Sequence, residues 1–396
     1  MKTNETNKPN KSNIIMLAIL LLNLFIAFMG ISLVIPVTPA IMNELHLSGS
    51  TVGYLVASFA VAQLIVSPIA GRWADRFGRK RMIVIGLIVF GISEFIFGIG
   101  KAIEALFLSR VLGGISAAFI MPAVTAFIAD ITTPKERSKA LGYMSASINT
   151  GFIIGPGVGG FLAEISTRMP FFVASGFALL AAVLSVILLR EPERNVASNE
   201  AGRQKPSIKR IFAPMYFIAF IIIFISSFGL ATFESLFSLF VDHKFGFTPK
   251  DIAIMITGGA VIGAFAQVVL FDRLTRKIGE IRLVRYCLML STVLVFLVTL
   301  VHAYFAVLLV TVIVFLGFDL IRPAVTTYLT KIAEGEQGFA GGMNSMFTSF
   351  GNVLGPIIGG MLFDMNLNFP FYFSVCLLII GTGFTFAWKE PKIERQ

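Results

Sequence analysis

The ten residues Gly151-Phe-Ile-Ile-Gly-Pro-Gly-Val-Gly-Gly160 recur 200 positions later as Gly351-Asn-Val-Leu-Gly-Pro-Ile-Ile-Gly-Gly360. Gly142, Ser145 and Pro170 recur with the same offset in this chain of 396 residues. Both copies lie inside long apolar segments, which indicates that one membrane module has been duplicated. Such a duplication, with a glycine-proline helix in each half, is typical of a transporter with two halves around a central path.

The composition excludes an ordinary soluble domain. Hydrophobic residues make up 56% of the chain and charged residues 14%, with a mean hydropathy of +0.85, whereas soluble domains carry roughly 25% charged residues. Apolar runs long enough to cross a bilayer predict twelve spans, at about 14–41, 52–71, 82–100, 103–129, 140–163, 170–189, 213–241, 251–271, 283–301, 304–330, 338–363 and 370–388.

These spans predict an all-α membrane protein of twelve transmembrane helices in two pseudo-symmetric six-helix bundles. We expect the bundles at residues 14–189 and 213–388. The stretch 190–212 between them is polar, charged and without apolar periodicity, and is interpreted as a linker.

The positive charges predict the orientation of the chain. Of its 32 Lys and Arg residues, 26 fall on the side of the two termini, four fall in the opposite loops, and Arg110 and Arg322 lie within spans. This asymmetry predicts a multi-pass protein of the cell membrane with both termini, residues 1–13 and 389–396, in the cytoplasm. It also accounts for the net charge of +10 without a nucleic-acid partner.

Residues Gly155 to Gly160 also fit the dinucleotide-binding pattern G-x-G-x-x-G. That pattern requires a preceding strand and an acidic residue about 20 positions on, but this copy lies inside an apolar span and no acid follows at Leu179 to Ala182. No phosphate-binding loop occurs either, so we expect no nucleotide or other cofactor. Cys287 and Cys376 lie in different apolar segments, which predicts neither a disulfide nor a metal site.

The glycine-proline repeat supports two interpretations that are compatible. Small residues three or four positions apart let helices approach closely. The prolines Pro156 and Pro356 each remove a backbone hydrogen bond, which predicts a bend that could serve as a gate between the halves. The gating residues expected from the repeat are Gly151, Gly155, Pro156, Gly159, Gly160, Gly355, Pro356, Gly359 and Gly360.

Three stretches resemble motifs of the major facilitator superfamily, and the resemblance covers essentially the whole chain. They are Gly71-Arg-Trp-Ala-Asp75-Arg76-Phe-Gly78-Arg79-Lys80, similar to the loop signature between the second and third spans; Arg110-Val-Leu-Gly-Gly114, similar to the fourth-span signature; and Gly151 to Gly160, similar to the fifth-span signature of drug/proton antiporters. Within the superfamily, the segments around Glu234 and from Phe315 to Thr326 resemble those of 12-span multidrug exporters of bacilli and staphylococci.

The loop signature departs from the family pattern in two places. Trp73 stands where the signature usually has Leu, and the second-half copy, Asp272-Arg273 to Gly279, has stretched spacing. We therefore expect the second loop to be the weaker lock.

In the first loop, Asp75 lies among Arg76, Arg79 and Lys80, where its carboxylate can pair with these cations and with a neighbouring helix N-terminus. The alternative is a solvated charge run of little energetic value. The resemblance favours a gating latch formed by Gly71, Asp75, Arg76, Gly78 and Arg79.

Five ionisable residues lie inside the predicted spans: Glu94, Arg110, Glu234, Asp319 and Arg322. Charges in a bilayer cost roughly 3 kcal/mol at mid-span, so each suggests a function. Burial disfavours the charged form of an acid, which allows it to carry a proton. Helical spacing allows Asp319 and Arg322 to pair, which would leave Glu234 as the better carrier; Glu94 has no obvious partner.

The resemblance links the acids at 234 and 319 to proton coupling, and Arg110 and Arg322 are assigned to the same machinery. The alternatives are a structural ion pair for the acids, and for Arg110 a role in binding the carbonyl groups of helix ends.

Aromatic residues near the acids are candidates for contact with a substrate, because ring faces attract cations and tolerate varied ligands. The residues expected to bind substrate are Phe152, Phe233, Phe237, Phe315 and Phe318, with Gln63, Asn149, Asn344 and Asn352 as polar groups. A sugar site would need denser hydrogen-bonding side chains.

Together these features predict a secondary active transporter, not an enzyme, that acts as a monomer. It would export structurally diverse lipophilic drugs, often cationic or zwitterionic, in exchange for protons by alternating access. Two alternatives remain: a proton-coupled exporter of one specific endogenous metabolite or sugar, and, less favoured, a membrane receptor or sensor without transport.

Overall fold

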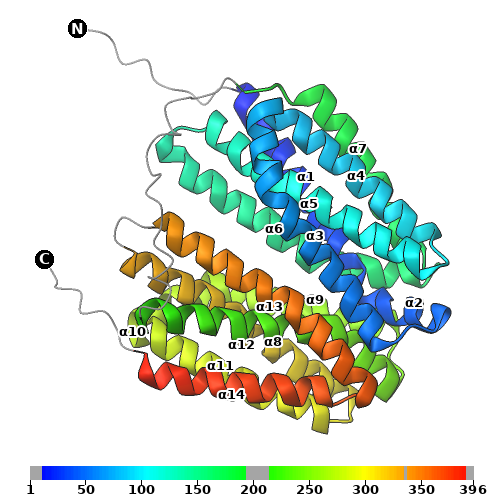
Figure 1. Ribbon diagram of the computed structural model, residues 1–396, viewed down its shortest axis with the longest axis vertical. Helices are drawn as coiled ribbons and strands as arrows, with labels where there is room; N and C mark the ends of the chain where they lie inside the picture. The colour runs from blue at the N-terminus through cyan, green and yellow to red at the C-terminus, as the bar shows by residue number, and fades with distance from the viewer. Residues whose placement is uncertain (1–10, 193–213, 334–336, 389–396) are drawn as a thin grey trace, which may run out of the picture. The chain divides into compact units, whose positions relative to one another are not determined.

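The computed structural model describes residues 11–192, 214–333 and 337–388 (Figure 1). Every regular element in these residues is helical, and twelve helical segments are long and apolar enough to cross a membrane. The predicted all-α membrane fold with twelve transmembrane helices is confirmed. The expected linker lies, from residue 193 on, outside the described residues, as do residues 1–10 and the C-terminal residues from 389.

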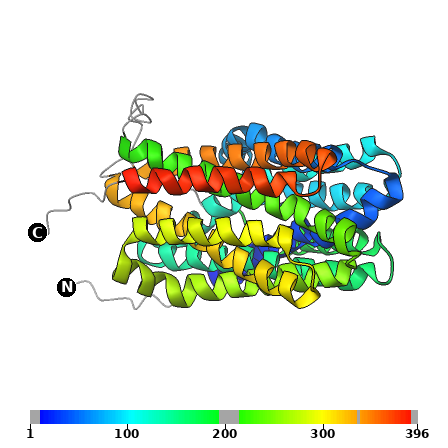
Figure 2. The same ribbon diagram turned by 90° about the horizontal axis from the view of Figure 1, so that it is seen from below.

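The helices follow one another in a repeated order. The first half contains α1 (Lys11–Leu33), the short η1 (Ile35–Val37), α2 (Thr38–Leu45), α3 (Gly49–Phe77), α4 (Arg79–Ile99), α5 (Ile103–Ile131), α6 (Pro134–Ala163) and α7 (Met169–Leu188). The second half contains α8 (Pro214–Phe245), α9 (Pro249–Phe265), the π-helical turn η4 (Ala266–Leu270), α10 (Phe271–Ile278), α11 (Glu280–Leu300), α12 (Tyr304–Ile332), α13 (Gln337–Met365) and α14 (Phe369–Ala387). Figures 1 and 2 show α11 beside α14, which it contacts along its length.

Glycine and proline set helix boundaries at matched places in the two halves. Gly78 and Gly279 have φ angles of 108° and 81°, which L side chains rarely adopt, and each directly precedes a helix of 21 residues, α4 and α11. Pro170 and Pro370 stand in the first turns of α7 and α14, where the missing N–H costs no hydrogen bond.

By packing, the described residues divide into two compact units. One unit is drawn from Met1–Ser32, Val61–Gly155 and Arg168–Gly202, and the other from Leu33–Ala60, Pro156–Thr167 and Arg203–Gln396. The second unit therefore includes one end of each of α3 and α6 together with α8 to α14. The division inside α6 falls between Gly155 and Pro156, within the repeated sequence.

The two copies of the repeat have the same burial pattern and the same role in helix packing. Their ten positions show an identical order of buried, half-buried and exposed residues. A Cβ atom on Gly151 would lie 2.8 Å from the carbonyl oxygen of Phe25 on α1, and one on Gly351 would lie 2.7 Å from the backbone nitrogen of Phe228 on α8. The glycines therefore allow α6 to touch α1, and α13 to touch α8, backbone against backbone.

Replacing Gly151 or Gly351 by Ala is expected to destabilise the protein by about 1–3 kcal/mol, because the added methyl group has no space. Thermal unfolding of the purified protein in detergent measures this effect. Gly142→Ala and Gly342→Ala are matched controls on the same helices, since nothing lies within 4 Å of a Cβ atom there. These controls should be neutral or slightly stabilising; equal losses at all four positions would contradict the packing role.

Candidate functional site

Two acidic side chains from facing helices form the centre of the candidate site. Glu234 on α8 and Asp319 on α12 are both half-buried and lie close enough to interact electrostatically. Within the described chain, neither carboxylate has a hydrogen-bonding or ion-pairing partner. Two carboxylates in a low-dielectric region repel each other, so the arrangement favours binding of a proton or a cationic group.

The expected pairing of Asp319 with Arg322 is wrong. No ion pair joins them in the part of the chain that the structure describes, and Arg322 is exposed. The Asp319 carboxylate instead lies against Gly263 of α9, where an added Cβ atom would overlap with it. Arg322, almost one turn further along α12, does not reach it.

A glycine pair on α9 makes room for the site. Gly259 accommodates the ring of Phe315, and Gly263 accommodates the carboxylate of Asp319, so residues four apart on one helix face residues four apart on the other. These glycines were not predicted from the sequence. Their Gly-x-x-x-Gly spacing at 259–263, a known helix-packing signal, could have revealed them.

The four aromatic residues expected to contact substrate beside the acids are packed in the core. Phe233, Phe237, Phe315 and Phe318 are 1%, 1%, 5% and 2% exposed. The ring centroid of Phe233 lies 4.9 Å from that of Phe237 and 5.9 Å from that of Phe315. This differs from the expectation: in this structure the rings hold the helices behind the acids and present almost no surface to a ligand.

The other expected substrate residues belong to separate units. In the first, Gln63 is half-buried, Asn149 is exposed, and Phe152 is 39% exposed with its ring 5.2 Å from that of Phe28. In the second, Asn352 is exposed and Asn344 donates a 3.4 Å hydrogen bond to the hydroxyl of Thr326.

An open hollow lies near Phe152 in the first unit. It is lined by Leu21, Leu22 and Phe25 of α1 and by Tyr143, Ala146, Ser147 and Thr150 of α6. Its mixture of aliphatic, aromatic and hydroxyl groups suits a lipophilic ligand with few polar atoms. Phe25 and Tyr143 were not predicted from the sequence, because nothing in their spacing distinguishes them from the other aromatic residues of a chain with 40 phenylalanines.

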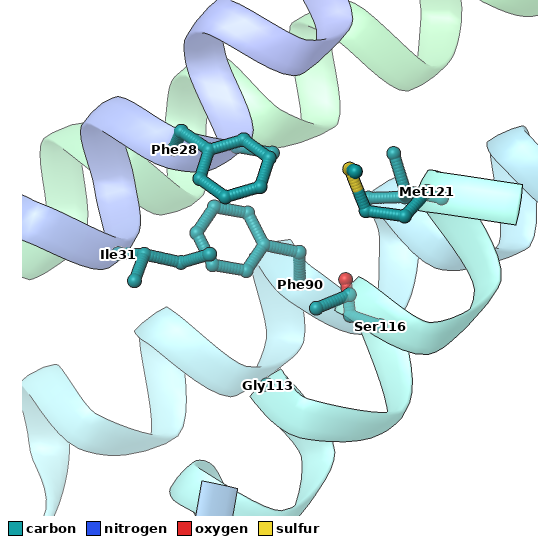
Figure 3. Close-up of a pocket in the computed structure, with 9 residues that line it drawn as sticks. Phe28, Ile31, Phe90, Gly113, Ser116 and Met121 are labelled. Carbon is teal, nitrogen blue, oxygen red and sulfur yellow. The ribbon is translucent and has the colours of Figure 1, made fainter. Parts of the chain in front are cut away.

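A second, more enclosed cavity lies between α1, α4 and α5 (Figure 3). The rings of Phe28 and Phe90 face each other on one side, and Met121 and Ser116 lie on the other. The Ser116 hydroxyl is already engaged, donating a 2.8 Å hydrogen bond to the carbonyl of Gly86. The cavity thus has no free polar group to orient a ligand.

Glu94 has a partner that the sequence did not reveal. Its carboxylate lies 3.4 Å from a guanidinium nitrogen of Arg110, and the two residues are 1% and 9% exposed. The guanidinium also lies 4.5 Å from the ring centroid of Phe97, a cation–π contact. Arg110 therefore belongs to a buried ion pair between α4 and α5, and its role in proton coupling stays a prediction.

The loop signature forms a charge network, but the acid that caps the N-terminus of α4 is not the expected one. Asp75 binds the Arg79 guanidinium at 2.5 Å, and Arg79 also binds Asp130 at the end of α5 at 3.1 Å. The start of α4, however, is capped by Glu191, which accepts hydrogen bonds from the backbone N–H groups of Arg79 and Lys80. Asp75 was expected to fill that position, but it is exposed and bound to Arg79 instead.

The remaining residues of the signature are positioned by different means. Gly78 has a φ of 108°, which L side chains rarely adopt, and a Cβ atom there would lie 2.8 Å from the Glu191 carboxylate. Arg76 stacks on Phe77 with its guanidinium 5.5 Å from the ring centroid. Gly71 has nothing within 4 Å of its missing Cβ atom.

The second half repeats the ion pair of the first with its charges exchanged. Arg79 and Asp130 correspond, 201 residues on, to Glu280 and Lys331, which also pair. In both cases the first residue of a 21-residue helix is joined to the end of the following 29-residue helix. Asp272 and Arg276, in the second copy of the loop, pair at 3.4 Å on the surface, where an ion pair contributes little.

At the C-terminal ends of α6 and α13, the two helices that contain the repeat, two carboxylates form related contacts inside the second packing unit. The carboxylate of Asp364, at the end of α13, accepts hydrogen bonds of 2.6 and 2.9 Å from the N–H groups of Gly49 and Ser50 at the start of α3. Glu164, just beyond α6, pairs at 3.1 Å with Lys250 at the start of α9. Each contact joins a helix of the first half to one of the second.

Repeat glycines and prolines lie directly behind these two contacts. Gly360 packs on Gly49, Pro356 on Gly53, and Gly160 on Ala253, each so closely that an added Cβ atom would overlap with its neighbour. Gly159 packs in the same way on Leu33. Gly355 and Gly359 pack against α8, where an added Cβ atom would lie 2.7 Å from the carbonyl oxygen of Phe228 and 2.8 Å from the side chain of Thr232, respectively.

Comparison with known proteins identifies relatives over nearly the whole length. The model of the Major Facilitator Superfamily matches residues 20–318 and 219–396. The chain is 74% identical over 377 residues to multidrug resistance protein 1 of Bacillus subtilis, covering 95% of this chain and 97% of that protein. It is 44% identical to the quinolone resistance protein NorA of Staphylococcus aureus, covering 94% and 96%.

Among solved structures, a bacterial homologue of the human lysosomal transporter Spinster superposes with a TM-score of 0.82. The two share 20% identity, and the match covers 96% of this chain and 97% of the other. At that identity the likeness concerns the fold alone.

Replacing Glu94 by Leu is expected to destabilise the protein by about 3–5 kcal/mol, because Arg110 would keep a buried charge without a partner. The double replacement Glu94→Leu with Arg110→Met should recover most of that loss, since it removes both charges together. Thermal or denaturant unfolding in detergent measures both variants. A double variant as unstable as the single one would show that the two charges do not stabilise each other.

Proposed function

We propose that this chain, which belongs to the major facilitator superfamily, exports structurally diverse lipophilic drugs in exchange for protons. The drugs are often cationic or zwitterionic. It is a transporter and not an enzyme. The names of its relatives, multidrug resistance protein 1 and quinolone resistance protein NorA, support drug efflux. The exchange with protons rests on the chain's own acids.

The observation that carries proton coupling is the pair Glu234 and Asp319. Both acids come from membrane-spanning helices, both are half-buried, and both lack a compensating cation in the described chain. A proton entering from outside would neutralise one of them and weaken its hold on a cationic drug. Release of that proton to the cytoplasm would restore the negative charge and the affinity for drug.

The driving force depends on the charge of the cargo. One charge that moves through 100 mV gains about 2.3 kcal/mol. Exchange of a neutral drug for one proton uses both the voltage and the pH gradient. Exchange of a monovalent cation for one proton moves no net charge, so it uses the pH gradient alone.

Contact with the drug is assigned to surface groups rather than to the buried rings near the acids. In the first unit, the hollow between α1 and α6 offers Phe25 and Tyr143, with Phe152 and Asn149 exposed nearby on α6. In the second unit, Asn352 is exposed on α13. The apolar character of the hollow suits lipophilic compounds.

Alternating access is assigned to the repeat helices α6 and α13. The packing units divide inside α6 between Gly155 and Pro156. Beyond that division Gly160 packs on Ala253 of α9, in the other half, while Gly159 packs on Leu33 of α1. Asp364 and Glu164 then act as latches that open and close with these contacts. The charge network of Asp75, Arg79 and Asp130 would serve the opposite end of the helices.

Orientation, cofactors and assembly complete the proposal. Both termini lie in the cytoplasm, as the distribution of Lys and Arg predicts. The protein needs no nucleotide, since the proton gradient supplies the energy, and it works as a monomer because each chain contains both halves.

Glu234→Gln and Asp319→Asn are expected to reduce drug transport driven by a pH gradient at least about tenfold, because a neutral amide cannot exchange the proton. The measurement is dye uptake into proteoliposomes with an imposed pH gradient, followed together with proton release. Glu104→Gln is the matched control, as Glu104 is exposed at the start of α5. Undiminished drug-driven proton release in both acid variants would refute their role. Transport of a sugar or other metabolite but of no dye would favour the specific exporter.

Cysteines placed at the two ends of α5 test the proposed orientation. In a Cys376→Ser background, Lys101→Cys should react with a membrane-impermeant thiol reagent in intact cells, because it precedes α5 on the outer side. Thr133→Cys, just after the same helix, should react only after the cells are permeabilised. The reverse pattern would invert the topology.

A further inference from the structure

Pro323 leaves one backbone acceptor of α12 without its usual donor. In an α-helix the carbonyl of residue 319 accepts a hydrogen bond from the N–H of residue 323. Residue 323 is proline, which has no N–H, so the carbonyl of Asp319 has no partner within its own helix. A backbone carbonyl without a partner is costly in a membrane span, because no water is at hand to bind it.

The side chain of Gln267 supplies the missing donor. Its Nε2 donates a 2.9 Å hydrogen bond to the carbonyl oxygen of Asp319. Gln267 lies in the π-helical turn Ala266–Leu270, which interrupts the transmembrane segment Pro249–Ile278 and is closed by a bond from the Phe271 N–H to the Ala266 carbonyl. Such turns are rare and frequently lie at functional sites.

Asp319 is therefore held at two points by one stretch of α9 and η4. Its carboxylate lies against Gly263, and its carbonyl is bound by Gln267, four residues further on. A carboxylate that gains a proton or a cation changes its charge and its contact at Gly263, while Gln267 ties the backbone of the same residue to the π-turn.

The charged surroundings of Asp319 are simple. Glu234 is the acid that α8 presents to it. The stretch of α9 and η4 from Gly259 to Gln267 contains no ionisable residue. On α11, the residues facing this part of α12 are Cys287 and Ser291, which pack at Gly317, and α13 has no ionisable residue before Asp364 in its described part. A change at Gln267 therefore acts on Asp319 through position, because it alters no charge.

We propose that Gln267 is a positioning residue for the proton step: it replaces the hydrogen bond removed by Pro323 and fixes Asp319 in the geometry that couples proton exchange to drug transport. This inference rests on the proposed function, in which Asp319 exchanges protons. Gln267 itself contacts neither the proton nor the drug.

The experiment is a double-mutant cycle of Gln267→Leu and Pro323→Ala in proteoliposomes. Leu removes the donor, and Ala at 323 restores an N–H within α12. The quantity measured is the number of protons released per drug molecule moved. We expect Gln267→Leu to lower this ratio severalfold, because the backbone of Asp319 would no longer be held in the geometry that ties drug movement to proton release. The double variant should regain most of the wild-type ratio.

Two further measurements separate the role in coupling from a role in folding. Val268→Ala, an exposed neighbour in the same π-turn, is the matched control and should leave the ratio unchanged. Thermal unfolding of all variants in detergent reports on the hydrogen bond itself, independently of transport. Gln267→Leu should lower the melting temperature, and Pro323→Ala in the same chain should raise it again.

The outcomes are distinct. A melting temperature rescued by Pro323→Ala, together with an unchanged ratio in Gln267→Leu, would make the contact purely structural and overturn the positioning role. A ratio lowered in Gln267→Leu but not restored in the double variant would overturn the assignment of the carbonyl as its target. A wild-type protein that moves drug without releasing protons would refute the proposed function instead.

Discussion

The requirement that every backbone polar group inside a membrane find a partner within the protein governs this structure. It explains why every regular element in the described residues is helical. It also makes each proline inside a span a place where something else must compensate. Pro68, Pro122, Pro156, Pro323 and Pro356 all lie inside helices. At Pro323 the compensation is visible as the hydrogen bond from Gln267. At Pro156 and Pro356, repeat glycines on the same helices, Gly151 and Gly355, place a neighbouring helix backbone in close contact.

The same medium separates the intramembrane charges into two kinds. Glu94 and Arg110 are almost fully buried and neutralise each other, an arrangement that is costly to break but has no free charge to offer. Glu234 and Asp319 carry charges of the same sign, are only half-buried, and have no compensating cation among the residues that the structure describes. Their negative charge must be balanced by a cation that binds and dissociates, either a proton or a cationic group. That difference is the physical reason for assigning the exchange of protons and cations to the second pair.

The sequence predicted the parts of the fold that depend on local composition. Twelve apolar runs and the Gly151 and Gly351 repeats were sufficient for the spans, and the identical burial of the two repeats follows from their shared residues. The errors concern contacts between distant segments. Nothing in the sequence joins Glu94 to Arg110, Glu191 to the start of α4, or Gln267 to Asp319, because each pair is brought together by helix packing. The four rings beside the acids were assigned to a ligand by proximity in sequence. In a membrane protein, proximity does not separate an exposed ring from one packed between helices.

The duplicated ion pair shows what the repeat conserves. Arg79 and Asp130 in the first half become Glu280 and Lys331 in the second, with the same attachment points and opposite signs. Both halves therefore keep an ion pair between the same two helices, although the helix that carries the positive charge differs. The acids follow a different rule. By the same offset of 201, Asp319 corresponds to Ala118, a fully buried residue of α5, so the first half has packing where the second has a carboxylate. A symmetric framework combined with an asymmetric charge fits the proposed mechanism, in which both halves move alike and only one of them responds to a proton.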